Sequence, residues 1–225
     1  TLAALSELVR NYGCTVVPCT ATQPALEHRP REFDIGIPSE AIRPMMPDPA
    51  SLHHELDRVH VYRLRLLSDE QLVARLAEQE QVLCIVNSRP HAAALYKALT
   101  ELKGREGCYH LSTFMCAQHR REKLAEIRQR LANGLPCRVI STQLIEAGVD
   151  VDFPTVYRAP AGFDSIAQAA GRCNREGKLS DSTGAPTKGN VFLFDTAKPP
   201  PAGLLRSAAD ATRELMSRYR NPLLH

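Results

Sequence analysis

The 225-residue chain is 44% hydrophobic and 24% charged, proportions of a folded globular protein that exclude a disordered or fibrous chain. Its formal net charge of +3 comes from 28 basic and 25 acidic residues, so only clustering of the basic residues would create a nucleic-acid surface. No apolar run approaches the roughly 18 residues that span a bilayer and no signal peptide opens the chain, so we expect no membrane association.

The first fifty residues predict little regular structure after an opening helix. Residues 1–12 form an amphipathic helical pattern that ends at Gly13, and residues 14–22 are a β-rich run. Residues 27–50 are rich in proline and irregular, which predicts a connector. Beyond it, strands are expected at 58–66, 82–87, 108–112, 137–142, 155–159 and 190–194. Helices are expected at 68–79, 90–102, 116–132, 164–172 and 203–219, the first opened by a capping box from Ser68 to Gln71.

The alternation of strand and helix defines the fold class. Repeated about five times, it predicts an α/β fold in which a parallel sheet is flanked by helices through right-handed crossovers. Ligands of such sheets bind beyond the carboxyl ends of the strands. The stretches that follow the strands are therefore the first places to look for a functional site.

Small polar side chains stand at the ends of three of the expected strands. They are Asn87, Ser88 and Arg89, then Thr113, then Thr142 and Gln143. Hydroxyl groups and free N–H groups at helix starts bind phosphate, although helix capping alone would explain any one of these residues. Their repetition along one sheet edge favours a phosphodiester chain as the ligand. Arg120, in the basic segment 119–130, is a candidate to extend this surface.

The seven cysteines are odd in number and follow no short repeating interval, which fits a reducing, cytoplasmic location. Cys108, His110, Cys116 and His119 are ligand types that suit zinc, but their spacing does not match the usual pairs of zinc knuckles. We interpret them as buried thiols and a surface histidine, and we predict that this chain binds no metal.

Residues 166–177, "IAQAAGRCNREG", place Gln168, Arg172 and Arg175 at offsets that share one face of a helix. Two guanidinium groups that point the same way repel each other, so an anion is expected between them. Arginine is the residue of choice for the oxygens of a transferring phosphoryl group. The alternative is a helix end, with the arginines on its dipole and a capping box from Ser165 to Gln168.

Besides these arginines, the sequence contains a candidate ribose-binding group but no phosphate-binding loop. Upstream, Gly148 and Asp150 in "STQLIEAGVDVD" offer a ribose-binding group, which we expect near the same sheet edge. A phosphate loop ends in Gly-Lys-Ser/Thr, but the Gly-Lys pair at 177–178 is followed by Leu179 and no strand precedes it. The acidic stretch at 68–71 caps a helix and follows no phosphate loop. The chain therefore offers arginines for a triphosphate that it does not itself hold.

These residues carry a family resemblance. "QAAGRCNREG" resembles motif VI of superfamily 2 helicases, "STQLIEAGVDVDFP" resembles motif V, and "CTATQPAL" at 19–26 resembles motif III. With the motif IV-like "IVNSRPHA", the wording is similar to the CRISPR-associated helicase–nuclease of type I interference systems. The resemblance covers most of 14–195. Because the first residue is threonine, we expect the chain to be part of a longer protein.

The resemblance implies the second RecA-like lobe of an ATP-dependent 3′–5′ DNA helicase, linked in the full protein to a nuclease. Residues 1–26 would be a remnant of the first lobe, 27–50 the interlobe connector and 51–225 the second lobe. ATP with Mg²⁺ would be held mainly by the first lobe, so this chain alone would be inactive. The implied partners are single-stranded DNA, the first lobe, the nuclease domain and a guide-RNA surveillance complex.

The resemblance also implies roles for individual residues. Gln168, Arg172 and Arg175 would reach ATP across an interlobe cleft, with Arg175 as the finger. Asp150, beside Gly148, would contact the ribose, and Thr20 and Thr22 would couple hydrolysis to lobe movement. The strand backbone would be held by Asn87, Ser88, Arg89, Thr113, Thr142 and Gln143. Two other functions remain open: a non-catalytic nucleic-acid-binding module of the same fold, and an RNA-directed superfamily 2 helicase.

Overall fold

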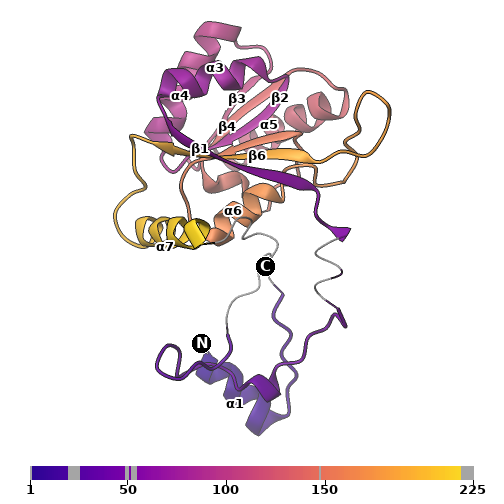
Figure 1. Ribbon diagram of the computed structural model, residues 1–225. Coiled ribbons are helices and arrows are strands. Elements are labelled where there is room, and N and C mark those ends of the chain that lie inside the picture. Colours follow the sequence, from indigo (N-terminus) through magenta and orange to yellow (C-terminus); the bar gives the residue numbers. More distant parts are fainter. Residues whose placement is uncertain (1, 20–25, 49–50, 52–54, 147, 219–225) are drawn as a thin grey trace. The chain divides into compact units, whose positions relative to one another are not determined.

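The computed structural model describes residues 2–19, 26–48, 51, 55–146 and 148–218 (Figure 1). The chain divides into two compact units, Thr1–Glu55 and Leu56–His225. Thr20 and Thr22, the predicted coupling residues, lie outside the described part. None of the described helices is long and apolar enough to cross a membrane.

The first unit contains little regular structure. Its helix α1, Leu2–Tyr12, ends at Gly13, which adopts the left-handed conformation with φ of 62°. The unit also contains a short 3-10 helix, Ser39–Ala41. The predicted β-rich run is wrong for residues 14–19, which form no strand, because no other described segment of this unit pairs with them in a hydrogen-bonding ladder. The assignment of 1–26 to a first lobe and of 27–50 to a connector stays a prediction.

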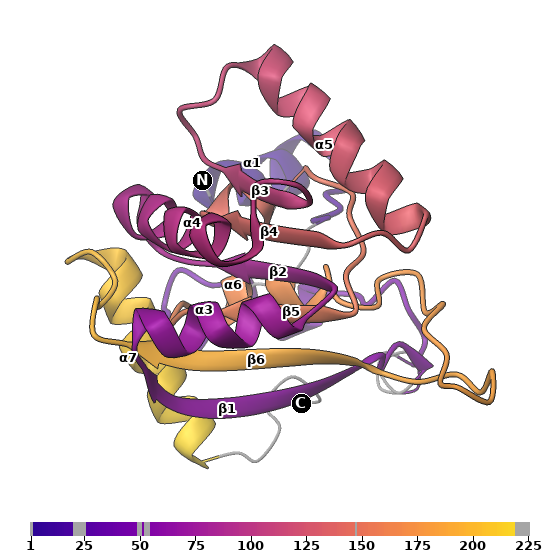
Figure 2. The same cartoon turned by 90° about the horizontal axis from the view of Figure 1, so that it is seen from above.

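The second unit is built on a six-stranded sheet in which every pair of neighbours is parallel, in the order β1-β6-β5-β2-β4-β3 (Figure 2). The strands are β1 Val59–Leu67, β2 Gln81–Ile85, β3 Cys108–Leu111, β4 Cys137–Ser141, β5 Thr155–Arg158 and β6 Gly189–Thr196. The helices are α3 Asp69–Glu78, α4 Arg89–Lys103, α5 Ala117–Ala132, α6 Phe163–Ala170 and α7 Leu204–Arg218. The predicted α/β fold with a parallel, helix-flanked sheet is thus confirmed.

Helices cover both faces of the sheet. Helices α3 and α4 lie on one face of the sheet, and α6 and α7 lie on the other (Figure 1). Side chains of α3 and α4 form one apolar cluster with the sheet, whereas those of α5, α6 and α7 form a second cluster. Strand β2 contributes to both, since Leu83 belongs to one cluster and Cys84 to the other. Burial on both faces explains why this strand is a continuous apolar run rather than an alternating one.

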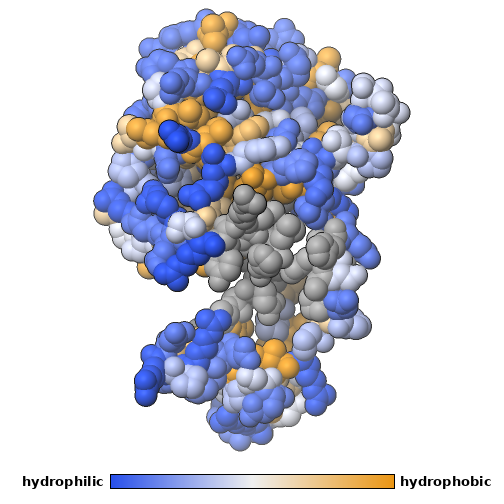
Figure 3. Space-filling model, in the orientation of Figure 1, coloured by the Kyte–Doolittle hydropathy of each residue, from blue (hydrophilic) through white to orange (hydrophobic). Residues whose placement is uncertain are grey.

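The outer strand β1 is less well covered. Leu66 remains 61% exposed, and apolar side chains reach the surface in the region of β1 (Figure 3). Tyr62 is also exposed, and its ring stacks on Phe192 of β6 with centroids 5.2 Å apart. Aromatic pairs of this kind stabilise neighbouring strands from the surface side.

The start of α3 confirms the predicted capping box. The Gln71 backbone N–H donates to Ser68 Oγ at 3.2 Å, and the Ser68 N–H donates to Gln71 Oε1 at 3.0 Å. Ser88 caps α4 in a similar way by accepting from the His91 N–H at 3.4 Å. These caps satisfy N–H groups that have no partner within the helices.

The first residue of α3 makes stability depend on pH. Although burial opposes it, hydrogen bonds from Lys198 and His91 lower the pKa of Asp69 below its ordinary value of 3.8. A carboxylate whose pKa is lowered by folding stabilises the fold above the unfolded value and loses that contribution as pH falls through the folded value. We therefore expect Asp69→Asn to reduce the loss of unfolding free energy between pH 7 and pH 3, measured by urea unfolding.

The matched control is Glu101→Gln, because Glu101 pairs with Lys97 only at 3.9 Å and both side chains are exposed. This control is expected to keep the pH dependence of the unmodified chain. An Asp69→Asn variant with the same pH dependence as the control would contradict the role given to Asp69.

Candidate functional site

The predicted site residues lie toward opposite edges of the sheet. The carboxyl ends of β2, β4 and β3 are neighbours, and the residues predicted to hold a phosphodiester backbone follow these three strands. Arg175 lies instead near the amino ends. Its N–H donates to Asp152, which precedes β5, and its carbonyl accepts from Arg58, which precedes β1. The expectation that Asp150 lies near the same edge as Thr142 is therefore wrong.

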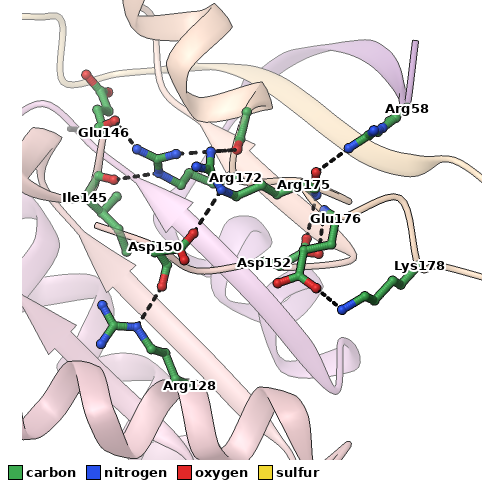
Figure 4. Close-up of polar contacts among 11 residues, drawn as sticks. Arg58, Arg128, Ile145, Glu146, Asp150, Asp152, Arg172, Arg175, Glu176 and Lys178 are labelled. Carbon is green, nitrogen blue, oxygen red and sulfur yellow. Dashed lines mark hydrogen bonds and ion pairs between the residues drawn. The ribbon is translucent and has the colours of Figure 1, made fainter. Parts of the chain in front are cut away.

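The reason for this separation is the path of the chain between β4 and β5. Because the two strands are parallel, residues 142–154 must return from the carboxyl edge to the amino edge of the sheet. Asp150 stands late in that return, close to the start of β5. Its backbone carbonyl accepts from Arg128 Nε at 2.8 Å, in the second half of α5 (Figure 4).

The segment that carries Arg172 and Arg175 is a turn and not a helix face. Helix α6 ends at Ala170, so only Gln168 of the predicted trio is helical. Asn174 has a φ of 46°, is buried, and donates through its side chain to the carbonyls of Arg58 and Thr187. The Arg172 carbonyl accepts from the Phe153 N–H at 2.9 Å and the Asn174 N–H donates to the Phe153 carbonyl at 3.0 Å, so backbone bonds to another segment replace the helical ones here.

The alternative capping box is wrong as well. Helix α6 begins after Gly162, which provides no side-chain cap, and Ser165 lies inside the helix. The arginines therefore do not complete a helix end of the kind that this alternative describes.

Arg172 is buried and ties two segments together. Its Nε donates to the Ile145 carbonyl at 3.1 Å and its Nη2 donates to the Glu146 carbonyl at 2.6 Å (Figure 4). Burial, together with the nearby charge of Arg175, lowers the pKa of Arg172. Its Nη1 also donates to the Gly171 carbonyl at 3.5 Å, so three nitrogens of the guanidinium are used within the fold and Arg172 is suited to fix the shape of the turn that presents Arg175.

Arg175 combines a fixed backbone with an exposed side chain. Its N–H donates to Asp152 Oδ1 at 2.7 Å, and the next N–H, of Glu176, donates to Asp152 Oδ2 at 3.0 Å. Its guanidinium pairs with Asp150 at 2.9 Å, with both side chains exposed (Figure 4). Exposed ion pairs contribute little energy, so the guanidinium can exchange this carboxylate for another anion. In this chain, Asp150 is the anion that accompanies Arg175.

Gly148 permits the chain to turn before Asp150. Its φ of 68° lies in the left-handed region that residues with side chains avoid, and a Cβ there would meet no other atom of the described residues within 4 Å. The glycine is therefore required by backbone conformation and not by close packing.

At the carboxyl edge, three predicted strand-binding side chains are already engaged in the fold, since Gln143 Nε2 donates to Asn87 Oδ1 at 3.5 Å and both Asn87 and Ser88 make further contacts. Asn87 donates to the Pro160 carbonyl at 2.6 Å and accepts from Arg158 at 2.9 Å. Ser88 caps α4, as described above. Contacts of these two residues with a nucleic acid would have to come mainly from their backbone groups at the start of α4.

The other predicted strand-binding residues differ in accessibility. Thr113 is exposed, whereas Gln143 and Arg120 are half-buried. Arg89 lies over the Phe114 ring, with its Cζ 3.6 Å from the centroid. Thr142 is buried, and its Oγ1 finds no hydrogen-bond partner within the described ranges. At this edge, Thr113 and Arg89 are thus exposed to solvent, whereas Thr142 is buried beneath the surface.

Sequence reasoning missed a buried ion pair behind this edge. Arg158, at the end of β5, is 1% exposed by side chain and lies 2.9 Å from Glu146, whose side chain is 7% exposed. Burial raises the pKa of Glu146, although Arg158 opposes the shift, and burial lowers the pKa of Arg158. The pair connects Asn87 at the carboxyl edge to the segment that Arg172 holds. The available signal was an arginine in the otherwise apolar strand "TVYRA".

The residues with zinc-ligand chemistry are dispersed. Cys108 is buried in β3, His110 stacks on Tyr96, and Cys116 is exposed before α5. Within the part of the chain that the structure describes, no three His, Cys, Asp or Glu side chains are placed to hold a metal ion.

Comparison with known proteins identifies the relatives of this chain. Residues 78–178 match the family model for the C-terminal region of the CRISPR-associated nuclease/helicase Cas3. The Cas3 of Methanothermobacter thermautotrophicus is 29% identical over 147 residues, which are 65% of this chain and 17% of that protein. The Cas3 of Haloferax volcanii is 54% identical over 56 residues, which are 24% of this chain and 6% of that protein. The chain thus spans less than a fifth of either relative.

Solved structures share the fold. The structure of T. fusca Cas3 with AMPPNP has a TM-score of 0.56 at 19% identity, covering 73% of this chain and 22% of that one. A CRISPR RNA-guided surveillance complex in a pre-nicking state contains a chain with a TM-score of 0.54 at 18% identity, covering 72% and 22%. With the family match, these likenesses support the resemblance of the chain to the C-terminal helicase lobe of Cas3.

Proposed function

Starting from the likeness to the C-terminal helicase region of Cas3, we propose that the chain is the second motor lobe of an ATP-dependent DNA helicase acting in type I CRISPR interference. The observation that carries this proposal is Arg175, whose backbone is held by Asp152 while its guanidinium remains exposed. A first lobe in the full protein would hold ATP with Mg²⁺, and Arg175 would exchange Asp150 for the γ-phosphate oxygens. Gln168 would complete this surface, and the released Asp150, beside Gly148, would face the ribose.

At the other edge of the sheet, single-stranded DNA would pass over the ends of β2, β4 and β3. Thr113, Arg89 and Arg120 would contact the phosphates together with the N–H groups at the start of α4. Thr142 and Gln143 would support the same strand from below. The two lobes would close when ATP binds and open after hydrolysis. The two binding sites on the strand backbone would then hold it alternately, and the motor would move 3′ to 5′ along the DNA.

In the full protein, this motor would be joined to a nuclease domain and recruited by a guide-RNA surveillance complex in the cytoplasm. Thr20 and Thr22 would couple hydrolysis to lobe movement. Alone, the chain would bind single strands weakly and would hydrolyse no ATP. The non-catalytic binding module and the RNA-directed helicase are the competing proposals, and the experiment below separates them.

The test is nucleic-acid-stimulated ATPase of the full-length protein. We expect oligo-dT to stimulate hydrolysis strongly and oligo-rU to do so only weakly. Stimulation by RNA alone would favour an RNA-directed helicase, whereas the absence of hydrolysis with either polymer would favour a binding module. On the chain alone, we expect Arg120→Ala to weaken oligo-dT binding and to reduce the salt dependence of the affinity by about one counterion.

The matched control for this binding measurement is Arg105→Ala. Arg105 carries the same charge and is exposed, whereas Arg120 is half-buried, and Arg105 precedes β3 at the amino edge of the sheet. Its loss is expected to leave affinity and salt dependence nearly unchanged. Equal effects of the two substitutions would show that the contribution of Arg120 is general electrostatic attraction and not a contact along the proposed path.

A further inference from the structure

Phe114 stands exposed at the edge of the sheet that the proposed DNA path crosses. It is 79% exposed, although burying such a ring typically stabilises a protein by about 1.5–3 kcal/mol. It follows Thr113 in the turn after β3, where the Met115 N–H donates to the Ser112 carbonyl at 3.1 Å. Met115 packs against the core, so this turn places one apolar side chain inward and the other outward.

The outward ring is in contact with an arginine from the connection after a neighbouring strand. Arg89, which follows β2, lies over one face of the ring with its Cζ 3.6 Å from the centroid. The same exposed cation can reach a phosphate while it remains stacked, because a guanidinium interacts with a ring through its plane and with anions through its edge. Since most of Phe114 is open to solvent, further planar groups can stack against its ring.

We propose that Phe114 and Arg89 form a stacking platform for a base of single-stranded DNA. This inference rests on the proposed function and adds a base contact to a site otherwise described by backbone contacts. Base stacking on an aromatic ring is tolerant of sequence, which suits a protein that must move along any strand. The position beside Thr113 would bring a base to Phe114 while its phosphate meets the hydroxyl and Arg89.

The platform is tested on the whole chain by fluorescence anisotropy with two labelled probes, oligo-dT and an oligomer of the same length that lacks bases. With oligo-dT, Phe114→Leu is expected to weaken binding by about 5- to 100-fold, whereas Phe114→Tyr stays within about twofold. With the abasic oligomer, Phe114→Leu is expected to bind as the unmodified chain does. Dependence on both the ring and the bases distinguishes stacking from loss of apolar surface.

The matched control is Leu102→Ala, which removes another exposed apolar side chain at the far end of α4. It is expected to leave the affinity for oligo-dT unchanged. If Phe114→Leu binds oligo-dT as tightly as the unmodified chain does, the platform is overturned while DNA binding stands, and the ring would instead fit a contact with protein. If Phe114→Leu loses equal affinity for both probes, the platform is likewise overturned. If the unmodified chain binds neither probe, the proposed function and the platform both fail.

Discussion

Replacing Arg175 with alanine in the full-length protein is expected to lower ATP turnover about 10³-fold or more while nucleotide still binds. The reason is the division of roles within the turn that carries it. Asp152 fixes the backbone, Arg172 fixes the shape of the turn, and only the exposed Arg175 guanidinium is left to act on a ligand. Arg175→Lys is expected to recover little, because an ammonium group lacks the planar fork of donors.

The measurements are steady-state ATPase and binding of a fluorescent nucleotide. Arg213→Ala is the matched control, since Arg213 is 52% exposed by side chain, close to the 46% of Arg175, and is likewise paired with exposed carboxylates. Both variants are expected to unfold at the temperature of the unmodified protein, because exposed pairs contribute only about 0–1 kcal/mol. Wild-type turnover in Arg175→Ala would remove the arginine from the proposed active centre.

Replacing Arg158 with alanine is expected to cost the fold about 3–5 kcal/mol, because it would leave the buried Glu146 carboxylate without its charged partner. The same change would remove a donor to Asn87. Urea unfolding of the chain, followed by circular dichroism, measures this loss. The combined substitution of Arg158→Met and Glu146→Leu is expected to recover much of it, since removing both charges leaves no unpaired group.

The pH dependence of this loss identifies the unpaired charge as its cause. Burial raises the pKa of Glu146, and without Arg158 the pKa rises further, so the folded state then binds a proton that the unfolded state releases. Stability therefore falls as pH rises, and the deficit of Arg158→Ala is expected to be larger at pH 8 than at pH 5. Arg218→Ala, which breaks an exposed pair with Glu214, serves as control at both values. A deficit below about 1 kcal/mol at pH 8 would contradict this account.

The fold followed from local patterns, because its strands are short apolar runs separated by amphipathic helices. The residues of β2 after Gln81 illustrate this, since all four are buried and apolar. The start of α3 was likewise predictable, since a capping box is completed within four residues. Patterns of this kind need no knowledge of the remainder of the molecule.

Two of the errors share a cause, which is that contacts between distant segments decided the outcome. The helical pattern does not continue to Arg175 because the backbone of Arg172 and Asn174 bonds to Phe153, and this distant partner cannot be read from the local sequence. The pairing of Arg158 with Glu146 depends on how β5 lies beside the segment after β4. The position of Asp150 was within reach of the sequence, since a residue shortly before a parallel strand must lie toward the amino edge of its sheet.

The separation of Arg175 from Thr113 by the length of the strands has a mechanical consequence. Six parallel strands packed between helices on both faces form a stiff body that resists local deformation. Under the proposed function, a displacement of the Arg175 end would therefore reach the Thr113 end as a rotation of the whole rigid body. The distance that the DNA-binding edge moves would depend on the axis of that rotation. Substitutions at either end could alter binding or hydrolysis without changing this distance.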